Sequence, residues 1–194
     1  YIIRVVNKRW NNKSNKSIKM NSSPTFKFPK IPSIKIPIIE GDNSSTEILS
    51  RITHNKKIII FGVPGSFTPT CSEKHLPGYI KFYEKFKKLG VDDIFCLSVN
   101  DKYVLKAWLK SYTNGYLIKG IADGNCEFSS IMNLSISYSK NFMGKRCKRF
   151  ALVANNNVIK QIYIEKKGEL LVSSAENVLK NFKVNIWYSI QYQK

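Results

Sequence analysis

One cysteine stands where a nucleophile would be expected. Cys71 closes a turn-rich stretch, residues 62–71, that lies between an apolar run and a segment with helical spacing. Free amide N–H groups and the positive end of a helix dipole favour a thiolate at such a position, and the thiolate is the attacking form of cysteine. Thr68 can aim its hydroxyl at the same point, while Pro64 stiffens the loop without a backbone donor. The arrangement favours a reactive cysteine over a small structural side chain.

The other three cysteines give weaker signals. Cys96 lies inside an apolar run, where an inert buried thiol is ordinary, and Cys126 is most simply structural. The chain contains no C-x-x-C pair and only two histidines, which argues against a structural zinc site. A disulfide scaffold is not expected either, because small secreted frameworks carry cysteine more densely. We therefore expect reduced thiols, no metal and no cofactor.

The segments on either side of Cys71 predict a strand, a loop and a helix in that order. The apolar run 58–61 is typical of a strand buried on both faces, as parallel sheets require. Pro77 either bends the following helix or marks its second start. Apolar side chains at helical spacing define that helix: Leu76, Ile80, Tyr83 and Phe86.

Strands and helices continue to alternate farther along the chain. A second apolar strand is expected over 94–99, followed by a helix capped by Asn100 or Asp101, which makes a parallel pair with a right-handed crossover. A shorter strand over 117–122 and a helix over 127–134 are expected next. One side of the capped helix carries the larger apolar side chains: Val104, Leu105, Trp108 and Tyr112.

A hairpin and a last helix complete the pattern. Residues 150–154 and 158–164 are joined by three asparagines, 155–157, which tolerate the positive φ of a tight turn. Ser173 and Glu176 form a capping-box pattern that opens a final helix. The whole series predicts an α/β fold, with a mixed central sheet and helices on both faces.

The charge of the chain is strongly basic and unevenly distributed. The formal net charge is +19, and nine of the 32 basic residues fall in residues 1–39, which contain no acid. Lysine outnumbers arginine by 27 to 5, a bias typical of AT-rich codons rather than of a nucleic-acid surface. Without a recognisable nucleic-acid motif, specific nucleic-acid binding is not expected. No apolar run approaches the roughly twenty residues of a membrane span, so no membrane contact is expected.

Composition divides the chain into three expected parts: a basic, disordered tail or transit peptide at 1–29, one domain at 30–182, and a C-terminal tail at 183–194. The chain begins with Tyr1 rather than Met, so a preceding signal sequence is an expectation. A plastid transit segment of the apicoplast type and an AT-biased extension explain the first part equally well. Plastid, cytosol and mitochondrion are the locations considered.

The active stretch resembles a known family. Pro64-x-x-x-Thr68-x-x-Cys71 matches the signature of the peroxiredoxins, and the longer stretch 62–78 is similar to their type-II or type-5 (atypical) subfamily. Further matching segments follow in the order of that subfamily, and with them the resemblance covers about residues 35–182. These segments are Cys96–Asp101, Lys106–Trp108, Ala122–Asp123 and Gly144–Phe150.

The resemblance implies a thioredoxin-like fold and thiol-dependent reduction of hydrogen peroxide and organic hydroperoxides. Carried over by position, Cys71 is the peroxidatic nucleophile, Thr68 orients the peroxide, and Pro64 shields the pocket. Arg149 matches the active-site arginine of the family. A guanidinium that keeps its charge can stabilise both a thiolate and the charge that develops on a leaving oxygen, so the physics agrees with this assignment.

Three neighbouring residues receive lesser roles by the same comparison. His75 matches a pocket position and is given a supporting role. For Arg146, a supporting role and a place on a solvated basic strand are equally favoured interpretations. Cys147 lies two residues before Arg149 and would feel its charge on a shared strand face, although an inert thiol is the stronger interpretation.

Turnover requires a second thiol to reduce the sulfenic acid formed on Cys71. In one branch of the family that thiol lies late in the chain, where this sequence has Val172. Cys96 matches the resolving position of plant-like members, but a packed strand would have to open before its sulfur could reach Cys71. We therefore favour a 1-Cys mechanism with an external thiol, glutathione with glutaredoxin first and thioredoxin second. A homodimer is expected by resemblance.

Two alternatives remain open at this point. One is a non-peroxidatic thioredoxin-fold protein that binds or exchanges thiols, against which the absence of C-x-x-C weighs. The other is a chaperone-like module that uses the basic tail to contact polyanions. Replacement of Cys71 would leave the second activity untouched.

Overall fold

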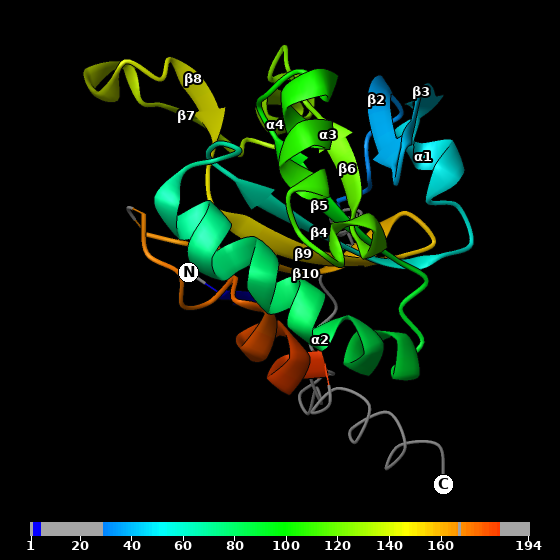
Figure 1. Ribbon diagram of the computed structural model, residues 1–194. Coiled ribbons are helices and arrows are strands. Elements are labelled where there is room, and N and C mark those ends of the chain that lie inside the picture. The colour runs from blue at the N-terminus through cyan, green and yellow to red at the C-terminus, as the bar shows by residue number, and fades with distance from the viewer. Residues whose placement is uncertain (1, 5–28, 167, 183–194) are drawn as a thin grey trace, which may run out of the picture.

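The computed structural model describes residues 2–4, 29–166 and 168–182, and Figure 1 shows their arrangement. An eight-stranded mixed sheet forms the centre, in the order β1-β10-β9-β4-β5-β6-β2-β3. Its strands are β1 (Ile2–Arg4), β2 (Lys35–Glu40), β3 (Asn43–Ile48), β4 (Lys57–Val63), β5 (Asp93–Ser98), β6 (Lys119–Ala122), β9 (Phe150–Asn155) and β10 (Val158–Ile164).

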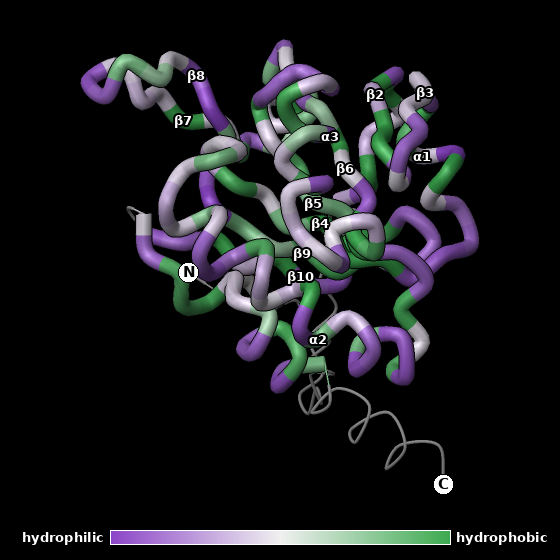
Figure 2. Tube along the Cα trace, viewed as in Figure 1, coloured by the Kyte–Doolittle hydropathy of each residue, from purple (hydrophilic) through white to green (hydrophobic). Residues whose placement is uncertain are grey.

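Helices cover both faces of this sheet, as the sequence predicts. One core layer lies between the sheet and α2, α3 and a final helix over 175–182, and the other lies beneath α1 and α4. The helical segments are α1 (Leu49–Ile52), the π-helical turn η1 (Cys71–His75), α2 (Leu76–Lys88), α3 (Lys102–Lys110), the 3₁₀ turns η2 (Gly115–Leu117) and η3 (Ser139–Asn141), and α4 (Glu127–Ile131). Figure 2 shows hydrophobic residues along the central strands and hydrophilic ones on the outer turns.

The predicted parallel pair lies at the centre of the sheet. β4 pairs in parallel with β5, β5 in parallel with β6, and β4 antiparallel with β9. Because β4 has neighbours on both sides and a core layer on both faces, its side chains from Ile58 to Val63 are buried. The predicted hairpin β9–β10 is present, and its turn places Asn156 and Asn157 at positive φ.

A ladder of aromatic rings fixes α2 on the sheet. The ring of Phe61 on β4 stacks on Tyr79 with centroids 4.0 Å apart, and Tyr79 lies 5.9 Å from Phe86. Phe86 in turn meets Phe182 of the final helix edge-on at 6.2 Å. Burying each ring contributes about 1.5–3 kcal/mol, so the ladder holds η1 and α2 firmly against β4.

Local details of the helices refine the sequence-based expectations. The buried face of α2 is centred on Tyr79, whereas Ile80 and Tyr83 are only partly buried. The final helix begins after Ser174, whose hydroxyl accepts from the backbone of Asn177; the capping box predicted from Ser173 is therefore displaced by one residue. Pro77 lies in the first turn of α2 and marks the second start that one of the two interpretations predicts.

The two edge strands of the central sheet were absent from the sequence-based expectation. β3 pairs antiparallel with β2 through the turn at Gly41, whose φ is +56°. The exposed, polar side chains of β3 give no alternating pattern, which explains why the hairpin escaped prediction. At the other edge, β1 pairs antiparallel with β10, so three residues of the expected disordered tail form a strand.

A small second sheet projects from the domain. It consists of β7 (Ser135–Ser137) and β8 (Lys145–Cys147), and Figure 1 shows this hairpin standing away from the central sheet. None of the described helices has the length and apolarity that crossing a membrane requires. The expected tails, apart from residues 2–4 and 29, lie outside the described residues.

Candidate functional site

The loop between β4 and η1 places Cys71 at the end of the parallel strands. Thr68 N donates to the carbonyl of Gly65 at 3.4 Å, and Ser72 N donates to the carbonyl of Thr68 at 2.9 Å. Between them, Phe67 adopts a left-handed φ of 61°, uncommon for a bulky side chain, which reverses the chain toward η1. Cys71 then begins η1 with its side chain fully buried.

A guanidinium contacts the buried sulfur. Arg149, which directly precedes β9, is 6% exposed, and its Nη1 donates to Cys71 Sγ at 3.5 Å. A permanent cation at this distance can stabilise negative charge on the atom it contacts. The Nε–H of Arg149 is buried and has no hydrogen-bond partner among the described residues. The cation is thus held inside the protein mainly through its outer nitrogens.

His75 connects the guanidinium to the opposite wall. Arg149 Nη1 lies 3.2 Å from His75 Nδ1, and His75 Nε2 lies 3.2 Å from the carbonyl of Ser173. Burial and then the charge of Arg149 lower the pKa of His75 to about 3, so the ring is neutral at physiological pH. Nδ1 therefore accepts from Arg149, and the Nε2–H donates to Ser173.

The loop residues predicted to meet the substrate lie in the connection between β4 and η1. Pro64 is buried directly after β4. The half-buried Thr68 donates its hydroxyl hydrogen to the carbonyl of Gly65 at 2.9 Å. Since its hydrogen is engaged, Thr68 Oγ1 is left to accept a hydrogen bond from an incoming O–H group.

Arg146 does not reach the sulfur. It is half-buried, with Nε donating to the carbonyl of Met143 at 2.7 Å and Nη1 to the carbonyl of Val99 at 3.0 Å. These bonds tie β8 to the end of β5, against the Gly65 loop. A side-chain Cβ at Gly65 would approach Arg146 Nη1 to 3.5 Å. Arg146 therefore supports the loop at Gly65 and is not a solvated basic residue.

The other three thiols, which are all unpaired and buried, differ from Cys71 in their surroundings. Cys96 lies within β5, and burial together with the neighbouring Cys71 raises its pKa well above the usual value. Cys147 lies in the opposite core layer, where burial likewise raises its pKa and its Sγ–H donates to the Val63 carbonyl at 2.9 Å. Cys126 starts α4 in that same layer.

Sequence reasoning missed two side chains, one on α3 and one in the turn after it, that hold η1. Trp108 Nε1 donates to Ser72 Oγ at 3.0 Å, and the Tyr112 hydroxyl donates to the carbonyl of Ser72 at 2.8 Å. Both residues were recognised only as parts of an apolar helix face. The signal in the sequence is their type, because buried Trp and Tyr usually find a partner for their polar atom.

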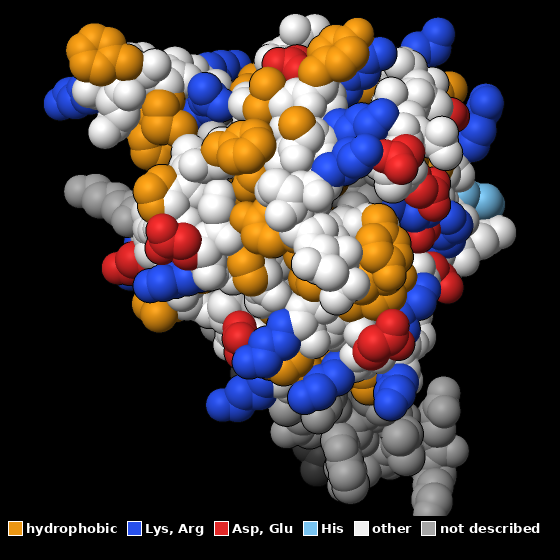
Figure 3. Space-filling view, in the orientation of Figure 1, with side chains coloured by type: hydrophobic (Ala, Val, Ile, Leu, Met, Phe, Trp, Pro, Cys, Tyr) orange, Lys and Arg blue, Asp and Glu red, His pale blue; other side chains and the backbone are white. Residues whose placement is uncertain are grey.

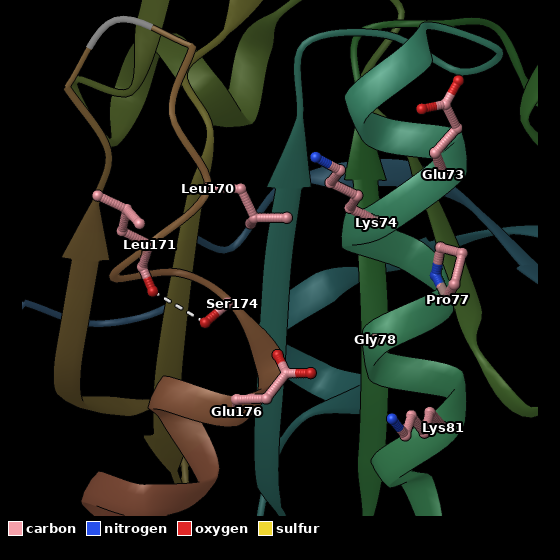
Figure 4. Close-up of a pocket in the computed structure, with 9 residues that line it drawn as sticks. All are labelled: Glu73, Lys74, Pro77, Gly78, Lys81, Leu170, Leu171, Ser174 and Glu176. Carbon is pink, nitrogen blue, oxygen red and sulfur yellow. Dashed lines mark hydrogen bonds between the residues drawn. The ribbon is translucent and has the colours of Figure 1, made fainter.

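A groove runs along the outer side of η1 and α2. Figure 4 shows it between these helices and the segment 170–176, and its volume is about 530 Å³. Cys71 does not line it, since the sulfur points into the core layer. The lining residues are Glu73, Lys74, Pro77, Gly78, Lys81, Leu170, Leu171, Ser174 and Glu176.

Comparison with known proteins gives a single family. Residues 27–179 match the Redoxin family model. Peroxiredoxin-2B of Arabidopsis thaliana is 43% identical over 141 residues, which cover 73% of this chain and 87% of that protein. The chloroplastic Peroxiredoxin-2E of the same plant is 38% identical over 137 residues, covering 70% of this chain and 58% of the relative.

A solved structure agrees with the sequence relatives. The Plasmodium falciparum antioxidant protein, a 1-Cys peroxiredoxin, superimposes with a TM-score of 0.75 at 36% identity, covering 82% of this chain and 98% of that one. The thioredoxin-like fold and the family expected from the sequence are thereby confirmed. The chain belongs to the peroxiredoxins, in their type-II or type-5 branch, and is a thiol-dependent peroxidase.

Proposed function

We propose that Cys71 is the peroxidatic cysteine and that Arg149 is the cation which activates it. The contact between Arg149 Nη1 and Cys71 Sγ, 3.5 Å, carries this assignment. Of the four thiols, only Cys71 contacts a guanidinium within the described residues. The same Nη1 group lies where it can stabilise charge on the leaving oxygen of a peroxide.

The first step is an in-line displacement on the peroxide. The Cys71 thiolate attacks the terminal oxygen of ROOH, the S–O bond forms, and the O–O bond breaks. Cys71 is oxidised to the sulfenic acid, and RO⁻ takes a proton to leave as an alcohol, or as water when the substrate is hydrogen peroxide. Thr68 Oγ1 accepts a hydrogen bond from the O–H group of the peroxide and thereby aligns the O–O bond with the sulfur. Pro64 keeps water away from the thiolate.

His75 supports the site by remaining neutral. A protonated ring beside Arg149 would repel the guanidinium, whereas the neutral Nδ1 accepts its hydrogen bond. The guanidinium keeps its charge for the sulfur, and its position is tied to η1. In this role His75 touches the catalytic arginine and not the substrate.

We propose a 1-Cys cycle with an external reductant. Cys96 is fully buried in the central strand β5, and burial raises its pKa, both of which disfavour attack on the sulfenic acid. An external thiol therefore attacks Cys71–SOH and releases water, and a second thiol reduces the mixed disulfide. Because Cys71 is buried, η1 must open locally before that thiol can reach it. Glutathione with glutaredoxin is our first choice, and thioredoxin is the second.

Assembly and location follow the same proposal. Phe67 and Tyr103 are 59% and 73% exposed, and Figure 3 shows apolar side chains over α3 and near the β7–β8 hairpin on the face that carries η1. This surface fits a homodimer, which light scattering of the purified chain would test.

A plastid location fits the basic first part of the chain and the chloroplastic relative, and a fluorescent fusion would test it.

The decisive experiment is chemical trapping on the reduced protein. One equivalent of hydrogen peroxide is added with a sulfenic-acid trap, and peptides are weighed by mass spectrometry. We expect the adduct on Cys71, and none in Cys71→Ser. Cys126→Ser, which removes a buried thiol from the opposite layer, serves as the matched control and should still form the adduct on Cys71.

Each other outcome of this trapping has a definite meaning. A disulfide that links Cys71 to Cys96, with no adduct, would replace the 1-Cys cycle by an internal one. A free Cys71 thiol after exposure to peroxide would overturn the assignment of the nucleophile itself.

A further inference from the structure

A closed ring of hydrogen bonds passes through Arg149. The guanidinium binds His75, His75 binds the carbonyl of Ser173, and Ser173 binds the carboxylate of Glu165. Glu165 N then donates to the backbone carbonyl of Arg149 at 3.0 Å. The ring thus starts at the main chain of Arg149 and ends at the side chain of the same residue.

Glu165 is the member of the ring that fixes the segment after β10. One oxygen, Oε1, accepts from Leu171 N at 2.7 Å, Ser173 N at 2.7 Å and Ser173 Oγ at 2.8 Å. These three bonds bring Leu171 and Ser173 back to the end of β10. Figure 4 shows the following residues, 170–176, running beside η1 and α2. The carbonyl of Ser173 is thereby presented to that helix pair.

The presented carbonyl receives two donors from buried side chains. His75 Nε2 lies 3.2 Å from Ser173 O, and the Tyr79 hydroxyl donates to the same oxygen at 2.9 Å. Tyr79 also stacks on Phe61, so this oxygen is fixed relative to β4 as well. Movement of Ser173 would therefore be transmitted directly to the imidazole.

The guanidinium depends on that imidazole for its orientation. Arg149 Nε has no hydrogen-bond partner among the described residues, whereas Nη1 bonds to Cys71 and to His75. A long side chain with an unanchored Nε can rotate unless its outer nitrogens are held. His75 is the partner that holds Nη1 while Cys71 is being oxidised.

We propose that Glu165 is a positioning residue for peroxide reduction. Through Ser173 and His75, Glu165 fixes the guanidinium of Arg149 next to the sulfur of Cys71, which is the reacting atom. The inference rests on the roles proposed above for Cys71 and Arg149. It adds a residue that lies 94 positions from the nucleophile in the printed sequence and touches neither the sulfur nor the substrate.

The test measures the second-order rate of Cys71 oxidation by hydrogen peroxide in stopped flow. Glu165→Ala leaves the three donors without their acceptor and is expected to slow oxidation by about 10- to 100-fold, as small displacements of catalytic groups do. Glu165→Gln retains an oxygen at the same place and is expected to stay within about threefold of the parent chain. Glu169→Ala, an exposed residue of the same segment, is the matched control and should be unchanged.

A double-variant comparison separates positioning from general damage. In an Arg149→Lys background the guanidinium is gone, so Glu165→Ala should slow oxidation by less than about twofold further. A purely structural effect would slow both backgrounds alike. If Glu165→Ala is too unstable at the assay temperature, Glu165→Asp replaces it, since it keeps the charge but shortens the reach by one methylene.

Failure of the inference can be told from failure of the proposed function. Unchanged oxidation in Glu165→Ala, equal losses in the Ala and Gln variants, or the same loss in the Arg149→Lys background would each overturn the positioning role. These results would leave the nucleophile untouched as long as Cys71→Ser is inactive. Activity in Cys71→Ser would overturn the proposed function instead.

Discussion

Cys71 and Cys147 are both fully buried, yet they lie in opposite core layers and meet opposite kinds of partner. Cys71 accepts a hydrogen bond from the guanidinium of Arg149 at 3.5 Å. Cys147 donates its own hydrogen to the carbonyl of Val63 at 2.9 Å. The first contact places a positive charge at the sulfur, whereas the second engages the hydrogen of a neutral thiol.

The comparison teaches that burial alone does not decide which thiol reacts. Burial raises the pKa of Cys147 and of Cys96, as expected for thiols away from water. Cys71 shares that burial but adds a cation and the first position of η1. The two environments are close together in the fold. Val63 is the last residue of β4, which leads into the loop before Cys71, and its carbonyl accepts the hydrogen bond from Cys147.

Removing each sulfur should produce the largest contrast between the two layers. Cys71→Ser lacks the only proposed nucleophile, so we expect peroxide reduction to fall to the uncatalysed rate. Cys147→Ser keeps a donor for the Val63 carbonyl, and we expect its rate to stay within about threefold. Both are measured as peroxide consumption with an excess of dithiothreitol. A loss of activity in Cys147→Ser with an unchanged melting temperature would contradict the comparison.

Removing the guanidinium of Arg149 tests whether its charge explains why Cys71 and not Cys147 reacts with peroxide. Arg149→Ala deletes the donor at Cys71 Sγ, and the loss of one such donor typically slows a reaction by about 10²–10³-fold. The rate of single-turnover oxidation by hydrogen peroxide is the quantity to measure. Arg146→Ala is the control, because this arginine bonds backbone carbonyls and not the sulfur; we expect less than about tenfold. Equal losses in the two variants would speak for general damage to the loop.

The sequence predicts the parts of the molecule that depend on local patterns. β4, β5 and the β9–β10 hairpin follow from unbroken apolar runs and an asparagine turn, and Cys71 with Thr68 follows from residue type and spacing. β3 could not be predicted, because an exposed edge strand needs no apolar alternation. Propensity and capping patterns also placed the last helix one residue too early.

The rest of the site depends on contacts that leave no pattern in the sequence. Arg149 could be assigned only through the family resemblance, since it lies 78 residues from Cys71. The link from His75 to Ser173 spans 98 residues and ends on a backbone carbonyl, which every residue type carries. Tertiary folding creates this contact, so Glu165 became visible only when the structure brought its carboxylate to Ser173.

The buried histidine predicts how acid affects the Cys71 layer. The pKa of His75 is about 3 in the folded protein and about 6.5 in an unfolded chain, so only the unfolded chain binds the proton between these values. Its contribution to stability is complete above pH 6.5 and is lost toward pH 3, at about 1.4 kcal/mol per pH unit. Urea unfolding at pH 7, 6, 5 and 4 measures this slope.

Two variants isolate the contribution of His75 from that of the carboxylates. His75→Gln has no group that titrates in this window, so its free energy of unfolding should fall less steeply with decreasing pH. His54→Gln alters an exposed histidine and serves as the matched control. Identical slopes in all three proteins would show that His75 is not the group responsible.

The smallest expected effect concerns how easily η1 opens around Cys71. Trp108→Phe removes the donor to Ser72 Oγ while keeping an aromatic ring, which should lower the free energy of unfolding by about 1 kcal/mol. Because opening of η1 exposes Cys71 and leaves the other layer closed, alkylation of Cys71 by iodoacetamide should accelerate severalfold, while Cys147 stays unlabelled. Tyr112→Phe, which removes the bond to the Ser72 carbonyl, should act in the same direction. If both thiols were labelled at the same rate, the protein would be opening globally, and the difference between the two cysteines would not extend to their access.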